Sequence, residues 1–210
     1  YLAATQFALG DLPGPTTPSA RLTPAAEACE KLDWRLGLAA PPTAAADMPT
    51  LYESIDKAAE LGLLHVAASS RQPISPAVSA PFGPGLSDDR RRDIRVTLDQ
   101  AGVRLLTWRL DNPPTTDAGW NDAFEFARRM GIEAVTLEPG SADLHKLDDL
   151  CQRHEMHLAL SWPRIATPDQ AARRFRDCSP WVGAAADDII EPPQALQALG
   201  DRLVTVSIDA

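Results

Sequence analysis

Cysteine and long apolar runs are both scarce in this 210-residue chain. The three cysteines, Cys29, Cys151 and Cys178, are an odd number without CxxC spacing, so they leave the redox compartment open. Buried free thiols are the favoured interpretation, and one disulfide with one free cysteine is the alternative. No window of about 18 uninterrupted apolar residues is present, so the sequence predicts no transmembrane segment.

Basic residues are also in short supply. The chain has 20 Lys and Arg against 29 Asp and Glu, a net charge of −9 and a pI of about 4.9. This balance argues against a nucleic-acid partner or an anionic membrane surface. The first residue is Tyr1 rather than Met, which a removed signal peptide or missing initial residues would explain. An exported or periplasmic location is therefore suspected, and a cytoplasmic one stays open.

Several catalytic signatures are missing. The sequence contains no G-x-S-x-G, P-loop or HExxH motif. No G-x-G-x-x-G follows the first predicted strand, which argues against an open dinucleotide-binding sheet, the runner-up architecture. Ser69, Ser161 and Ser207 follow or end predicted strands without a histidine at the same face. Nucleophilic catalysis of the Ser-His type is therefore not expected.

What is present begins with a proline-rich segment. Residues 10–18 include Pro13, Pro15 and Pro18 and cannot hold a helix, because proline fixes φ and removes an amide donor. Thr23 and Pro24 then suit the N-cap and first turn of a short helix. We interpret residues 1–33 as an N-terminal arm with this helix, and residues 34–210 as the main domain.

From residue 34 onward, strands and helices alternate. Thr50 and Glu53 form a predicted capping box for a helix reaching about Leu61, and a second helix is predicted from about Ser87 to Ala101. Thr116, Ser141 and Thr167 are further predicted N-caps. The last predicted helix covers 193–199. Glycines end several of the helices. The seven predicted strands are 34–39, 64–68, 103–108, 134–138, 157–161, 181–186 and 203–208.

Strict alternation of this kind implies a parallel sheet, since each crossover is helical. Seven repeats exceed the usual open sheet, so we predict an α/β fold of the (β/α)8 TIM-barrel type with the eighth repeat missing or supplied elsewhere. Either the chain continues beyond Ala210 or something else fills the gap. An incomplete barrel would expose its first and seventh strands as an open edge.

In such barrels the active site lies at the C-terminal ends of the strands. Glu138, Asp187 and Asp188 follow predicted strands there and could bind a divalent cation through carboxylate oxygens. The alternative is that Asp187 or Asp188 pairs with an arginine or caps a turn. None of the four histidines is predicted at this face, so a histidine-containing metal site is not expected.

Two tryptophans and two arginines are candidates for ligand binding at the same strand ends. Trp108 and Trp162 could stack on a sugar ring, while Arg109 and Arg164 could bind hydroxyls or a carboxylate. The alternative is that the tryptophans simply plug the mouth of the barrel.

The segment FEFARRMGIE at 124–133, followed by LEP at 137–139, resembles the fourth repeat of the xylose-isomerase-like TIM barrels, which include sugar phosphate isomerases and epimerases. LDDLC at 147–151, LAL at 158–160, VGAAAD at 182–187 and ALQALGDRLV at 195–204 continue the resemblance, which covers about residues 34–210. It implies a barrel that holds a divalent metal (Mn, Mg or Zn) through residues after strands five, six, seven and eight.

The chain departs from that pattern. The resemblance places the strand-five ligand on Ser161, the strand-six aspartate on Asp187 and the strand-seven histidine on Ser207, with the strand-eight glutamate beyond the chain. A histidine usual after the strand-six aspartate is absent near Ile190, and Ser161-Trp162-Pro163 stands where relatives often have His-Asn-His-Pro. Serine hydroxyls are poor replacements for carboxylate or imidazole ligands.

The leading hypothesis is therefore a divergent barrel that has lost metal-dependent catalysis and acts as a binding, accessory or structural subunit, with other protein subunits as partners and a small sugar as a further ligand. No cofactor is expected in that case. The alternative is a metal-dependent sugar isomerase or epimerase with a rearranged site, in which Glu138 and Asp187 are the catalytic or metal-binding carboxylates. A third reading is a metal-free lyase or hydrolase that acts on a sugar.

Overall fold

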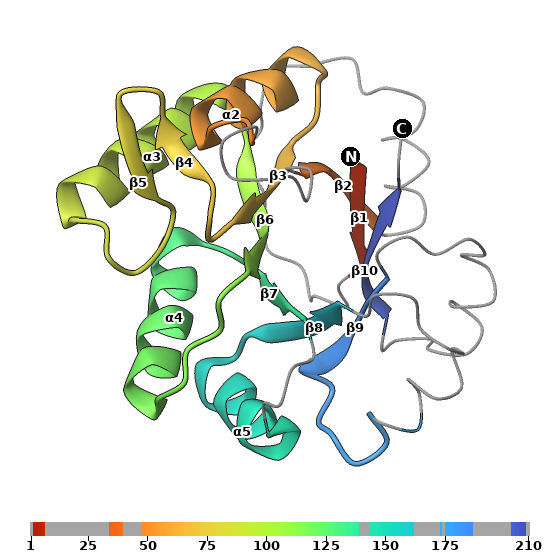
Figure 1. Ribbon diagram of the computed structural model, residues 1–210. Coiled ribbons are helices and arrows are strands. Elements are labelled where there is room, and N and C mark those ends of the chain that lie inside the picture. Colours follow the sequence, from red (N-terminus) through yellow and green to blue (C-terminus); the bar gives the residue numbers. More distant parts are fainter. Residues whose placement is uncertain are drawn as a thin grey trace.

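The computed structural model describes residues 2–6, 34–39, 48–138, 143–161, 173, 175–186 and 203–208. Eight strands form a closed barrel in the order β1, β10, β9, β8, β7, β6, β3, β2 (Figure 1). Seven of them run parallel: β2 (Trp34–Ala39), β3 (His65–Ser69), β6 (Arg104–Leu110), β7 (Ala134–Leu137), β8 (His157–Ser161), β9 (Val182–Ala186) and β10 (Leu203–Ile208). These are the seven strands that the sequence predicted, and the TIM-barrel prediction is confirmed.

The eighth position is filled by the N-terminal strand β1 (Leu2–Gln6), which runs antiparallel to both neighbours. Leu2 pairs with Ile208 of β10 and with Leu38 of β2, so this short strand joins the two ends of the parallel sheet. The sequence alone predicts that residues 1–33 form an arm outside the barrel and that the barrel has an open edge. Both expectations are corrected for this segment, because the ladder hydrogen bonds of β2 and β10 are met by β1.

Four helices cover the outside of the described strands: α2 (Leu51–Glu60), α3 (Asp88–Ala101), α4 (Asp117–Met130) and α5 (Leu144–His154). The Thr50–Glu53 capping box forms as predicted, and Ser87 and Thr116 cap α3 and α4. Gly102 and Gly131 end these two helices at φ values of 67° and 71°, the left-handed region that glycine adopts without strain. The predicted cap at Ser141 is wrong: α5 begins later, with Asp143 as its N-cap.

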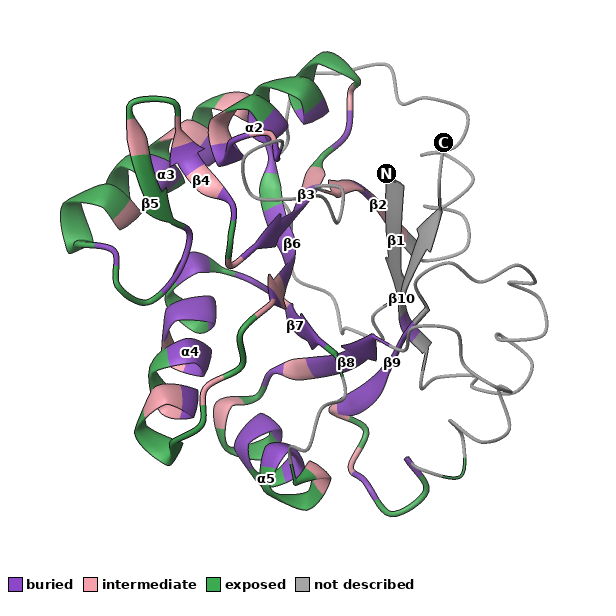
Figure 2. Ribbon diagram, in the orientation of Figure 1, coloured by how far each residue is buried: buried purple, intermediate pink, exposed green. Residues whose placement is uncertain are grey.

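The inner faces of these helices carry the core. Figure 2 shows buried residues on the sides of α2, α4 and α5 that face the strands and exposed residues on the opposite sides. The outer surface of the barrel contributes Val66, Trp108, Val135 and Leu158 to the same core cluster. A separate, smaller cluster fills the barrel interior, formed by Leu106, Ala134, Ala159, Ala185 and Val204. The two clusters identify which side of each strand faces inward.

The segment after β3, expected to be a loop, contains a two-stranded hairpin of β4 (Pro73–Ser75) and β5 (Val78–Pro81). Buried Gln72 fastens it to the barrel. Its amide nitrogen donates to the Pro49 carbonyl at 3.0 Å and to Ser54 Oγ at 2.9 Å, and its side-chain oxygen accepts from Ser69 N at 3.3 Å. These bonds fix the end of β3 relative to the start of α2.

Other predictions meet the structure in part. Cys151 and Cys178 are buried free thiols, as favoured from the sequence, whereas Cys29 lies outside the described residues. The predicted helices after Thr23 and at 193–199 also lie outside them, as does the predicted start of the helix after Thr167. Within the described part of the chain, no helix is long and apolar enough to cross a membrane.

Candidate functional site

A one-residue bulge in β6 decides which side chains face the barrel interior. Val66 of β3 pairs with Leu105, but the next residue, Ala67, pairs with Thr107, so β6 carries one extra residue at Leu106. Side chains alternate along a strand, and a bulge shifts that alternation by one. After the bulge, Thr107 and Arg109 point inward, because their β7 partners Ala134 and Thr136 lie on the interior side.

The bulge turns Trp108 outward. Its side chain is completely buried, its indole nitrogen donates to the Phe82 carbonyl at 3.3 Å, and its ring lies 5.0 Å from that of Phe126 on α4. The proposed stacking of Trp108 on a sugar in the mouth is therefore corrected, because both its position and its contacts assign it to the layer between strand and helix.

Arg109, in contrast, reaches the C-terminal mouth. Its Nε donates to Asp111 Oδ1 at 3.0 Å, and the two side chains are 27% and 15% exposed. Asp111 is held in turn by the end of β3: Ser69 Oγ donates to Asp111 Oδ2 at 2.6 Å, and Ser70 Oγ lies 3.2 Å from the same oxygen. Backbone Asp111 N donates to Ser70 Oγ at 2.9 Å. We call these four residues the Arg109 cluster.

On the next two strands, β7 and β8, the side chains that face the mouth carry hydroxyl groups. Thr136, buried, pairs with Arg109 across β6 and β7. Ser161 ends β8, is buried, and pairs with Ala185, which belongs to the interior cluster, so Ser161 also faces inward. Glu138 follows β7 directly and is exposed at the same end of the barrel.

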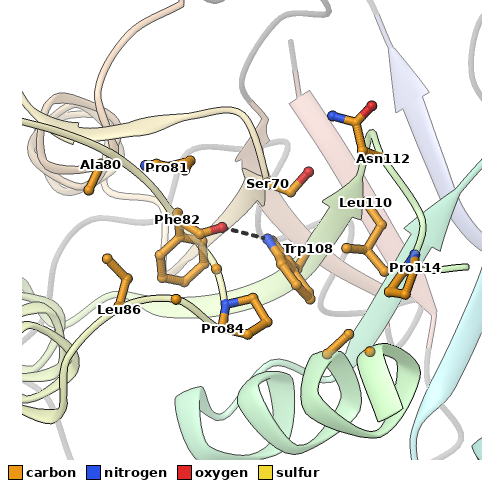
Figure 3. Close-up of a pocket in the computed structure, with 14 residues that line it drawn as sticks. Ser70, Ala80, Pro81, Phe82, Pro84, Leu86, Trp108, Leu110, Asn112 and Pro114 are labelled. Atoms are coloured by element: carbon orange, nitrogen blue, oxygen red, sulfur yellow. Dashed lines mark hydrogen bonds between the residues drawn. The ribbon is translucent and has the colours of Figure 1, made fainter. Parts of the chain in front are cut away.

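A cavity of about 320 Å³ lies on the outer side of β6, between residues 80–86 and the start of α4 (Figure 3). Figure 3 shows prolines on its opposite sides, with Trp108 between them. Its lining is mainly apolar and includes Pro81, Phe82, Pro84, Leu110 and Pro114. Ser70 contributes to both this cavity and the Arg109 cluster, so the cavity borders the mouth without being part of the barrel interior.

The opposite end of the barrel holds a second charged group. Arg35 of β2 forms an ion pair with Glu133, which precedes β7. Burial lowers the pKa of neighbouring His65 to about 4, and the positive charges of Arg35 and Arg104 act in the same direction. Burial raises the pKa of Glu133, against the opposing effect of Arg35. These groups lie at the N-terminal ends of the strands, far along the barrel from the mouth.

The histidines lie where the sequence predicted them. His65 and His157 begin β3 and β8, and burial lowers the pKa of His157. His145 and His154 lie on α5, where the ring of His154 stacks on Phe124 at 5.4 Å. None of the four therefore lies at the C-terminal end of a strand.

Four sequence-predicted site residues, Trp162, Arg164, Asp187 and Asp188, lie outside the described residues. Ser207 lies on β10, opposite Ala3 of β1, and its side chain is not described. Among the residues that the structure describes, no group of three or more His, Cys, Asp or Glu side chains could hold a metal ion. Glu138 is therefore the one predicted metal-binding carboxylate whose position is known.

Sequence reasoning missed Asp111 as a site residue. Arg109 and Asp111 are two apart, the spacing that places two strand residues on the same face, and this was the available signal. Their contact with Ser69 and Ser70 requires that β3 and β6 are neighbours and that β6 carries a bulge. The spacing of residues in the sequence indicates neither feature.

No family model matches the sequence, and no curated protein sequence matches it. Solved structures match the fold. An uncharacterised protein from Parabacteroides distasonis aligns with a TM-score of 0.63 and 23% identity, over 73% of this chain and 67% of that protein. A xylose isomerase-like TIM barrel protein from Mycobacterium smegmatis, solved in complex with magnesium, aligns with a TM-score of 0.51 and 17% identity, over 78% of this chain and 68% of that one.

A sugar phosphate isomerase/epimerase from Parabacteroides distasonis aligns with a TM-score of 0.52 and 9% identity, over 73% of this chain and 67% of that enzyme. This chain thus spans about two thirds of the length of these neighbours. Its fold is that of the xylose-isomerase-like TIM barrels, as the resemblance implied, at the low identities of a divergent chain.

Proposed function

We propose that this chain is a non-catalytic barrel that binds a small ligand at its C-terminal mouth and serves as an accessory or structural subunit of a larger assembly. The observation that carries the proposal is Ser161. It ends β8 with its side chain facing the interior and buried, at the position where the resemblance expects a metal ligand. A neutral hydroxyl is a weak ligand for a divalent cation, which prefers carboxylate or imidazole groups.

The described donor set does not fit the metal that the fold family implies. The inward residues at the ends of β3, β6, β7 and β8 are Ser69, Arg109, Thr136 and Ser161, which supply three hydroxyls and a cation. Arg109 repels a divalent cation instead of coordinating it. This combination favours binding of a polar organic ligand over the polarisation of a sugar carbonyl by a metal.

A second candidate function rests on Glu138. This exposed carboxylate lies directly after β7, at the face where barrels carry out chemistry. Paired with Asp187, it would give a sugar isomerase or epimerase with a rearranged, metal-binding site. The two candidates differ in one measurable property, which is stoichiometric binding of a divalent cation.

The test is calorimetric titration of the full chain with Mn²⁺, Mg²⁺ and Zn²⁺, combined with turnover assays on a panel of aldoses, ketoses and their phosphates. The non-catalytic proposal expects no stoichiometric site and no turnover. A one-to-one site that is lost in both Glu138→Gln and Asp187→Ala, together with turnover that those variants abolish, would overturn it.

A gain-of-function variant sharpens this test. Ser161→Glu restores a carboxylate at the end of β8 and should strengthen cation binding if the serine is what weakens the site. Ser79→Glu, which changes an exposed serine of the hairpin, is the matched control. Equal cation binding by the two variants would show that Ser161 does not control metal affinity.

A further inference from the structure

We infer that Arg109 anchors the carboxylate of a polyhydroxylated ligand, a sugar acid, in the mouth of the barrel, and that Asp111 orients Arg109 for this task. The inference deepens the binding role proposed above and rests on it. It starts from the hydrogen-bonding capacity that the Arg109 cluster leaves unused.

Arg109 has N–H donors that form no hydrogen bond with any described residue. A guanidinium group carries five N–H donors, and the Nε donor is used on Asp111 Oδ1 at 3.0 Å. Neither Nη group forms a hydrogen bond with a described residue, although only 27% of the side chain is exposed. A partly buried cation with unused donors is stabilised by an acceptor, and an anionic acceptor gives the stronger bond.

Both carboxylate oxygens of Asp111 already accept hydrogen bonds within the Arg109 cluster. Oδ2 accepts from Ser69 Oγ at 2.6 Å and lies 3.2 Å from Ser70 Oγ, while Oδ1 accepts from Arg109. Its position fixes the guanidinium through Nε, so the two Nη groups form the free edge of the fork. Asp111 is therefore a positioning residue, and the cluster as a whole offers donors.

The planar fork matches a carboxylate better than a phosphate. Two parallel N–H groups pair with two carboxylate oxygens in a bidentate arrangement. A phosphate dianion would bring a second negative charge to a site with one arginine, with Asp111 in contact and Glu138 beyond Thr136 on the next strand. The inward hydroxyls of Thr136 and Ser161 then suit the hydroxyl groups of the same ligand.

The inference is tested by calorimetry on the full chain in EDTA, with sodium D-gluconate, D-glucose and D-glucose 6-phosphate as probes. Gluconate should bind at least about tenfold more tightly than glucose, and more tightly than the phosphate. Arg109→Met should weaken gluconate about 10- to 100-fold, the usual effect of losing hydrogen bonds to a charged group, and leave glucose unchanged. Arg95→Met, at an exposed site on α3, is the matched control and should bind gluconate normally.

Two further variants separate anchoring from folding. Arg109→Lys keeps the charge but loses the fork, and should still weaken gluconate binding. Asp111→Asn should reduce the preference for gluconate over glucose while the protein stays folded by circular dichroism. A preference for the phosphate, equal binding of glucose and gluconate, no effect of Arg109→Met, or no gluconate binding at millimolar concentration would each overturn the inference. The cation titrations report on the proposed function separately, since EDTA removes metal from this experiment.

Discussion

Asp111 follows β6 and connects Arg109 of that strand to Ser69 and Ser70 at the end of β3, so its loss should lower the stability of the fold. Asp111→Ala leaves the hydroxyls of Ser69 and Ser70 and the Nε of Arg109 without their acceptor. We expect a loss of about 1–3 kcal/mol in the free energy of unfolding, measured by urea denaturation at pH 7. Asp93→Ala is the control, because its pair with Arg90 is exposed and should change stability by less than about 0.5 kcal/mol. Equal losses would contradict the assigned contacts.

His65, at the N-terminal end of β3, should make the stability of the fold sensitive to acid. Its pKa in the folded chain is lowered to about 4, mainly by burial, so between that value and the unfolded value near 6.5 the unfolded chain binds more protons. Stability should therefore fall as pH is lowered through this window, by up to about 3 kcal/mol from His65 alone. Urea denaturation from pH 7 to pH 4 should show a shallower decline for His65→Gln. Parallel profiles would exclude this role, since Glu133 and the other titrating groups are common to both proteins.

At the site, the sequence predicts which residues end the strands better than it predicts which side of the strand each side chain faces. Arg109 and Trp108 were both assigned to the mouth because both end a strand. Consecutive residues of a strand face opposite sides, so only one of the two can face the interior. The extra residue at Leu106 decides that it is Arg109 and not Trp108. Nothing in the run Leu105-Leu106-Thr107 marks a bulge, because all three residues suit a buried strand and no glycine is present. The partner strand, and not the local sequence, reveals it.

N-cap side chains stabilise the first turns of α2, α3 and α4. The capping box of α2 gives the clearest test of this contribution. Thr50 accepts a hydrogen bond from Glu53 N at 3.3 Å, and Glu53 accepts from Thr50 N at 2.8 Å. Thr50→Ala should cost about 1 kcal/mol, seen as a lower urea midpoint with an unchanged slope. Thr97→Ala, within α3, removes a threonine that caps nothing and should not lower the midpoint. An unchanged midpoint for Thr50→Ala would show that the box does not support α2.

The same local chemistry explains which elements the sequence predicted. Helix starts at Thr50, Ser87 and Thr116 and stops at Gly102 and Gly131 depend on side chains within one turn, so they can be read directly. The β4–β5 hairpin was missed because its strands are short and rich in Pro and Ser. They are held by Gln72, whose partners lie on other elements. Such contacts are tertiary and have no local signature.

For the whole molecule, the count of seven parallel strands raised the question of how the barrel closes. The sequence left two answers open, a continuation beyond Ala210 or another filler, and the structure places β1 in the gap. An antiparallel strand needs no helical crossover, so the N-terminal segment can close the sheet without a complete repeat. The five residues of β1 contain no Val, Ile or aromatic residue and no apolar–polar alternation, so the local sequence does not predict a strand there.

Closure by β1 predicts that the N-terminus is essential to stability. Ala4 pairs with Val206 on one side and Leu36 on the other, so it lies within the sheet. Proline there removes a backbone donor and is poorly tolerated in a central strand. We expect Ala4→Pro to lower the thermal midpoint and to promote self-association, because β2 and β10 regain unpaired edges. Ala4→Val keeps the amide and suits a strand, so it should remain monodisperse by size-exclusion chromatography with a nearly unchanged midpoint. If the two variants behave alike, the barrel does not depend on β1 for its closure.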